Sequence, residues 1–119
     1  MKKYPEFLTT EANRVAHGGD PALQGFVFEG ADEAQVVFWQ SEKSGEMPED
    51  AHDFWEYALV VEGTFDGMVG GKRLHLEPGD EMLVPPHTPH SGRYSAGYRS
   101  IDVFGGKRVE RLGLARKND

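Results

Sequence analysis

Short apolar segments separated by glycine and proline turns constrain the fold of this chain more than any other feature. Seven runs rich in β-branched and aromatic side chains follow one another, at residues 25–30, 35–40, 55–61, 64–69, 72–76, 81–84 and 98–104. Runs of this kind, each ended by a turn signal, predict strands. The Gly70-Gly71 pair between two of them predicts a tight hairpin. The pattern therefore predicts an all-β sandwich or barrel.

Length and composition agree with one small, turn-rich domain. The chain has 119 residues, a length that one domain accounts for. Its 15 glycines and 7 prolines would disrupt the interior of a helical bundle, while its seven Phe, four Tyr and two Trp argue against a disordered chain. We expect an N-terminal arm over residues 1–24 with at most a turn or two of helix, a β-barrel over 25–106, and a basic tail over 107–119.

Charge and cysteine content exclude several classes of function. There is no cysteine, so any metal site must use His, Asp and Glu. The net charge is −7, made of −10 over residues 1–106 and +3 over 107–119. The acidic body argues against nucleic acid as a partner, and the tail is interpreted as a solvated terminus. No apolar run approaches the roughly 18 residues of a membrane span, and none follows the first lysines as in a signal peptide. We expect a cytoplasmic protein that does not bind membranes.

Chelating side chains gather in the segment 46–56. If this segment is a strand, Asp50, His52, Phe54 and Glu56 lie on one face, because side chains alternate with a period of two. That face continues into apolar residues of the next run, so it is expected to point inward. Buried carboxylates and imidazoles without partners are costly. A divalent ion such as Fe, Mn, Ni or Zn would compensate them.

A second segment, residues 84–91, carries two more histidines. Three prolines stiffen this loop and so preset the directions of His87 and His90. The two segments together resemble the two sequence motifs of the cupin superfamily. The matches, separated by 15 residues, are Asp50-x-His52-x3-Glu56-x6-Gly63 and Gly79-x5-Pro85-x-His87-x2-His90-x3-Tyr94.

The resemblance implies a fold and a ligand set. The fold would be a single-domain double-stranded β-helix, the jelly-roll or cupin barrel, with little helix, and the protein a homodimer formed by pairing of sheet edges. His52, Glu56 and His90 would hold one divalent transition metal ion per chain (Fe, Mn, Ni or Zn). Asp50 stands where the family usually has its first metal histidine. It would be a fourth ligand, an orienting group or a base.

Candidate pocket residues lie around these ligands. Phe54 shares the inward face of the first segment, and either Phe38 or Trp39 must point inward on its strand. We take Trp39, with His87 at the rim. Arg93 and Tyr94 follow His90 directly, where an arginine would bind a substrate carboxylate or phosphate or else pair with a surface acid. His17 is expected in a surface loop, and Asp102 stays unassigned.

Three functions are consistent with these residues. The first is a metal-dependent enzyme acting on a small polar metabolite, as a dioxygenase, an isomerase or a lyase, because the motifs point to the metal and not to the reaction. The second is a binding or sensor module that captures a small ligand without turnover. The third is a metal-free structural barrel.

Overall fold

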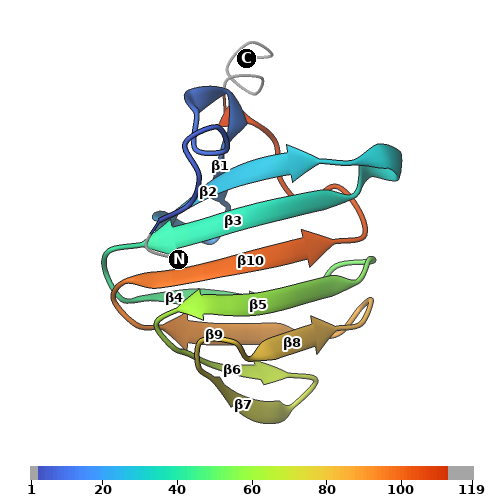
Figure 1. The fold of residues 1–119 in the computed structure, drawn as a ribbon. Helices are drawn as coiled ribbons and strands as arrows, with labels where there is room; N and C mark the ends of the chain where they lie inside the picture. The colour runs from blue at the N-terminus through green and yellow to red at the C-terminus, as the bar shows by residue number, and fades with distance from the viewer. Residues whose placement is uncertain (1–2, 113–119) are drawn as a thin grey trace.

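The chain folds as two antiparallel β-sheets (Figure 1), seen in a computed structural model that describes residues 3–112. The strands are β1 (Arg14–His17), β2 (Asp20–Glu29), β3 (Gln35–Ser41), β4 (Gly45–Asp50), β5 (Glu56–Glu62), β6 (Phe65–Val69), β7 (Lys72–Leu76), β8 (Glu81–Val84), β9 (His90–Tyr94) and β10 (Tyr98–Phe104). Two three-residue 3-10 helices, η1 (Glu11–Asn13) and η2 (Ala31–Glu33), accompany them. The all-β prediction is confirmed. None of the helices among the described residues is long and apolar enough to cross a membrane.

The order of the strands places the last strand of the chain inside the larger sheet, between earlier strands. The larger sheet has the order β1-β2-β3-β10-β5-β8, and the smaller has β4-β9-β6-β7. In Figure 1 the strands of the larger sheet follow one another down the picture from β1 to β8. The last strand, β10, lies between β3 and β5. β6 and β7 form the hairpin predicted at Gly70-Gly71, where both glycines have positive φ.

The main core lies between the two sheets, and buried residues alternate with partly exposed ones along the strands that form it. Along β3 the residues Gln35, Val37 and Trp39 are buried, and their neighbours are partly exposed. Trp39 is therefore the inward aromatic of its pair, while Phe38 faces the outside of the sheet. The Trp39 ring packs on Gly25 of β2, where a Cβ atom would come within 2.3 Å of it. Gly25 thus sets how deep this ring sits in the core.

The N-terminal segment packs onto the outer face of the larger sheet. Tyr4 and Leu8 are buried there against Phe26, with Phe38 and Ile101 beneath them. The Tyr4 hydroxyl lies 2.8 Å from the carbonyl oxygen of Ser100 in β10 and 3.0 Å from that of Trp39 in β3. Residues 1–24 thus contain β1 and the beginning of β2 as well as the covering segment. The helix expected there is η1, a single 3-10 turn.

The first residues of the basic tail also fold back onto the body. The buried Gln35 amide donates to the Val109 carbonyl at 2.8 Å and accepts from the backbone N–H groups of Arg108 and Val109 at 2.7 and 3.0 Å. Val109 is itself buried. Residues 107–112 are therefore part of the fold and not a solvated terminus, whereas residues 113–119 of the predicted tail lie outside the described residues.

Candidate metal centre

Two histidines and one glutamate meet at the end of the space between the sheets. Glu56 begins β5, His90 begins β9, and His52 lies in the connection before β5. His52 Nε2 is 2.9 Å and His90 Nε2 is 3.4 Å from Glu56 Oε1. Potential ligand atoms of all three residues lie within 4.8 Å of one another. We call these three residues the His–Glu–His triad.

Backbone carbonyls fix the orientation of both imidazoles. His52 Nδ1 lies 2.9 Å from the Phe54 oxygen, and His90 Nδ1 lies 3.0 Å from the Thr88 oxygen. Because a carbonyl oxygen only accepts, each Nδ1 carries a hydrogen. Each Nε2 therefore faces Glu56 with either a lone pair or a second, exchangeable proton. This is the arrangement found around metal-binding histidines, whose other ring nitrogen donates to a carbonyl or carboxylate.

The electrostatics of the triad favour a cation between its members. Burial would raise the pKa of the Glu56 carboxyl, but hydrogen bonds from the two histidines lower it to about 2. Burial would likewise lower the pKa of the His90 ring, but its bonds to Glu56 and to the Thr88 carbonyl raise it. Glu56 is thus a buried anion with two imidazoles around it. A divalent ion replacing the imidazole protons fits this donor set.

The triad opens into a small interior cavity whose lining is partly apolar and partly charged. Its volume is about 40 Å³, little more than the roughly 30 Å³ that one water molecule occupies in the liquid. Glu56 and His90 line it, together with the apolar residues Trp39, Ala58, Phe65, Met82, Tyr98 and Phe104. The size suits an ion with one or two small ligands and excludes a bulky molecule.

Comparison with known proteins gives the family. Residues 37–96, half of the chain, match the sequence family described as a Cupin domain. The chain is a cupin. The resemblance read from the two motifs is thereby confirmed. No match was found among the curated proteins.

Solved structures show the same fold along nearly the whole chain. KdgF from Halomonas sp. is similar with a TM-score of 0.72 at 20% identity, over 88% of this chain and 96% of its own. An RmlC-like cupin from Shewanella frigidimarina gives 0.69 at 28% identity, over 96% and 99% of the two chains. The polyketide cyclase RemF from Streptomyces resistomycificus gives 0.66 at 17% identity, over 92% and 81%. The jelly-roll prediction is confirmed.

Asp50 does not join the triad of this cupin. Its side chain is 45% exposed, and its Oδ2 accepts a hydrogen bond from Arg108 at 2.9 Å. The prediction of one continuous strand from Asp50 to Glu56 was wrong. β4 ends at Asp50 in the smaller sheet and β5 begins at Glu56 in the larger one. The chain between them crosses from sheet to sheet, so a period of two cannot extend through it.

The three aromatic pocket candidates differ in their relation to the triad. Trp39 lines the cavity. Phe54 lies outside it and stacks on the His52 ring, with the ring centroids 4.5 Å apart. Tyr94 is buried between the sheets, stacks on Tyr98, and hydrogen-bonds to Asp20. Phe54 therefore packs against the ring of one member of the triad, and Tyr94 is part of the core.

The polar pocket candidates point away from the cavity. Arg93 is 77% exposed beside Glu46, because alternation along β9 turns His90 and Tyr94 inward and Arg93 outward. His87 is exposed, with a φ of +62°, and its backbone N–H donates to the His52 carbonyl oxygen at 2.6 Å. Its contribution is therefore to tie the two ligand-bearing loops together through the backbone.

Three residues at the cavity were not predicted from the sequence. His17, expected in a surface loop, ends β1 and lines the cavity beside Trp39, with their ring centroids 5.5 Å apart. Arg108 from the C-terminal segment also reaches the lining, as does Asp102 from β10. Among the described residues, Asp102 Oδ1 is a buried oxygen without a hydrogen-bond partner. Burial, followed by the nearby Glu56 carboxylate, raises the pKa of Asp102 well above its usual range.

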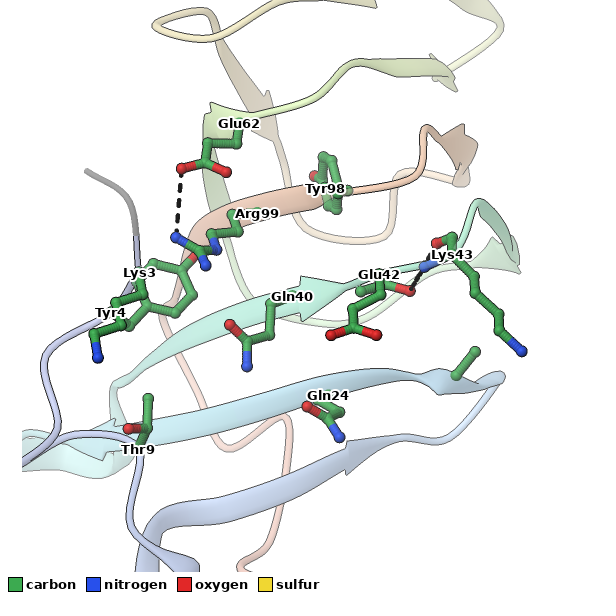
Figure 2. A pocket seen from close by; sticks show the side chains of 13 residues that line it. Lys3, Tyr4, Thr9, Gln24, Gln40, Glu42, Lys43, Glu62, Tyr98 and Arg99 are labelled. Carbon is green, nitrogen blue, oxygen red and sulfur yellow. Dashed lines mark hydrogen bonds and ion pairs between the residues drawn. The ribbon is translucent and has the colours of Figure 1, made fainter.

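A larger hollow lies on the outer face of the six-stranded sheet, away from the triad (Figure 2). It has a volume of about 660 Å³. Arg99 is one of its lining residues and lies 3.4 Å from Glu62 and over the Tyr4 ring. The charge of Arg99 is thereby compensated within the protein. Over residues 3–112, the group of side chains suited to hold a metal ion is the triad, which does not line this hollow.

Proposed function

We propose that this cupin binds one divalent transition metal ion through the His–Glu–His triad and is an enzyme acting on a small polar metabolite. The observation that carries the proposal is the pair of Nδ1-to-carbonyl bonds. These bonds direct two Nε2 atoms at one buried carboxylate, an arrangement with no evident purpose in a purely structural core. A bound ion would supply Lewis acidity that polarises an oxygen of the substrate.

The chain's own residues would orient the substrate. The apolar residues of the cavity lining would exclude water and strengthen electrostatic contacts at the triad. The buried Asp102 carboxyl, close to Glu56, offers a hydrogen-bonding group to a substrate oxygen. Arg108 lines the same cavity 2.9 Å from Asp50, and its guanidinium offers a second hydrogen-bond donor group to a substrate oxygen. We therefore propose a hydroxy- or carboxylate-bearing metabolite, small enough for a narrow site.

Metal content tests the first half of the proposal. Protein purified without added metal is expected to carry about one transition metal ion per chain by elemental analysis. His52→Ala and His90→Ala are each expected to lose it, because each removes one of three ligands. His75→Ala is the matched control, since His75 is exposed on β7 and bonded to Asp66. A content below about one tenth that Fe, Mn, Ni or Zn does not restore would refute metal binding.

Turnover tests the second half. A panel of small hydroxy- and carboxy-metabolites is incubated with the loaded protein, and both thermal shift and product are measured. Product formation that His90→Ala abolishes and His75→Ala keeps supports an enzyme. A thermal shift without product supports the sensor function instead, and contradicts the proposed enzyme while leaving the metal site intact.

A further inference from the structure

A third histidine lines the same cavity as the His–Glu–His triad, and its hydrogen bonding is the reverse of theirs. His17 ends β1, two residues after the buried Val15, and packs edge to face on Trp39 at the cavity. The Gly19 backbone N–H donates to His17 Nδ1 at 3.1 Å. Because a backbone N–H only donates, Nδ1 keeps its lone pair, and the hydrogen of the neutral ring is carried by Nε2.

The surroundings of His17 keep its ring neutral. Burial lowers the pKa of the imidazole, and the positive charge of Arg108 lowers it further. Three carboxylates act in the opposite direction without reversing the shift, those of Asp20, Asp50 and Glu56. A second proton would also have to occupy Nδ1, where it would displace the hydrogen bond from Gly19. The side chain therefore presents one tautomer, with a donor at Nε2.

The hairpin tip that carries His17 is anchored to the other sheet. A Cβ atom on Gly19 would come within 2.8 Å of Pro48 Cγ, so the turn between β1 and β2 lies directly against β4. Asp20, the next residue, is buried and accepts a hydrogen bond from the Tyr94 hydroxyl of β9. These contacts hold the imidazole in place at the cavity, as a binding site requires of its side chains.

The three histidines of the cavity region thus divide into two kinds. His52 and His90 have their Nδ1 atoms on carbonyl oxygens, so each can offer an Nε2 lone pair to a metal ion. His17 accepts at Nδ1, so its Nε2–H donates and is not a metal ligand. Within residues 3–112 the hydrogen bond of this ring is the one at Nδ1, which leaves the Nε2–H for a group that enters the cavity.

We propose that His17 is a substrate-binding residue, whose Nε2–H donates a hydrogen bond to a carboxylate oxygen of the molecule bound at the metal. The inference rests on the proposed function, because it requires a ligand beside the ion. A carboxylate suits this donor better than a hydroxyl or an amine does, since it only accepts and forms the stronger, charge-assisted bond.

The charges around the cavity allow an anion there once the ion is bound. Asp50 and Arg108 are paired at 2.9 Å, and the raised pKa of Asp102 favours its neutral carboxyl form. Glu56 contributes one negative charge to the lining, which a divalent ion exceeds by one. A carboxylate that binds at the ion and accepts from His17 would bring the site to neutrality.

Formate binding to the Co²⁺-loaded full chain tests the proposal, since formate is the smallest carboxylate and the visible spectrum of Co²⁺ follows its binding. His17→Phe keeps an aromatic ring on Trp39 but removes the donor, and is expected to weaken formate binding about 10-fold or more. His17→Gln loses the ring but keeps an N–H donor, and is expected to bind within about threefold of the parent chain. His75→Phe, at an exposed position of β7, is the matched control and is expected to bind as the parent chain does.

The two variants separate hydrogen bonding from packing. Parental affinity in His17→Phe with a loss in His17→Gln would make the ring a packing group and overturn the proposal. Equal losses, parental affinity in both variants, or a cobalt-loaded parent chain that does not bind formate would also overturn it. His17→Leu replaces His17→Phe in the comparison if the latter lacks the parental circular dichroism.

Metal content distinguishes this inference from the proposed function. His17→Phe is expected to retain about one ion per chain, because His17 is not a ligand. Full metal content with formate binding insensitive to His17 contradicts the inference alone, whereas a parent chain that binds no metal contradicts the proposed function as well. In the metal-free parent chain, long-range ¹H–¹⁵N correlations of the imidazoles are expected to show His17 protonated at Nε2 and not at Nδ1. A hydrogen on its Nδ1 would overturn the inference without any variant.

Discussion

Two backbone carbonyl oxygens outside the cavity determine the orientation and the tautomer of the triad histidines. The Phe54 and Thr88 carbonyl oxygens hold a hydrogen on each Nδ1 and thus direct each Nε2 to Glu56. Both carbonyls belong to residues two positions from the histidine that they bind. The orientation is therefore local to each loop, and the stacking of Phe54 on His52 reinforces it.

Asp50 is the residue whose role the structure changes most, and its substitution gives a clear test. Its carboxylate is bound to Arg108 and to the Ala51 N–H, and it lies outside the triad. We expect Asp50→Asn to weaken metal binding by less than about threefold, and His52→Ala to weaken it by more than about 100-fold. Calorimetric titration of the metal-free proteins with Zn²⁺ or Co²⁺ measures both. A loss for Asp50→Asn as large as that for His52→Ala would instead make Asp50 a ligand.

At the scale of elements, the C-terminal segment depends on one side chain of β3. Gln35 is buried and makes three hydrogen bonds to the backbone of Arg108 and Val109. Replacing it by Leu leaves those backbone groups without partners at a cost of about 1–3 kcal/mol each. We expect Gln35→Leu to lower the free energy of unfolding by about 3 kcal/mol or more in urea denaturation, and to speed amide exchange over residues 107–112.

The control for this prediction lies on the same strand. Gln40 is partly exposed on the outer face, where Gln40→Leu makes the same chemical change without orphaning a buried backbone group. We expect it to change stability by less than about 0.5 kcal/mol. Equal losses for the two variants would mean that the hydrogen bonds of Gln35 do not anchor the segment. Because Arg108 lines the cavity, Gln35 also influences the site.

Three strands, β1, β4 and β9, were not predicted from the sequence, and for β4 and β9 the physical reason is visible. β4 (Gly45–Asp50) is an edge strand with mostly exposed polar residues and a register shift next to Pro48, so it lacks an apolar alternation. β9 begins with a histidine and has Gly92 at its centre, where a Cβ would come within 2.1 Å of the Phe65 ring. The seven predicted strands were confirmed because each presents apolar residues to the core at a period of two.

The candidate site was predicted to the extent that its residues lie in local motifs. The spacing around His52, Glu56 and His90 is readable along the sequence, and the structure brings these three together. His17, Asp102 and Arg108 reach the same cavity from β1, β10 and the C-terminal segment. Their approach depends on strand order, in particular on β10 lying between β3 and β5. No local pattern in the sequence contains that information.

At the scale of the whole molecule, the four tyrosines lie in different layers of the fold, so their ionisation can be used to follow unfolding. Tyr4 covers the outer face, Tyr94 and Tyr98 lie between the sheets, and Tyr57 is bonded to Glu81 at the surface. Burial raises the pKa values of Tyr4 and Tyr98, and it raises the pKa of Tyr94 to about 12. The hydrogen bond to Glu81 raises the pKa of Tyr57.

These shifts predict how the protein unfolds in alkali. An unfolded chain ionises its phenols near pH 10, whereas the folded chain keeps them protonated to higher pH. The tyrosines therefore cost no stability below about pH 10, and stability falls as the pH rises above it. We expect tyrosinate absorbance and loss of circular dichroism to appear together in one transition above pH 10. In Tyr57→Phe, which leaves only the three buried phenols, the two signals should coincide even more closely. Two or more phenols titrating near pH 10 with full circular dichroism would contradict the packing described for Tyr4, Tyr94 and Tyr98.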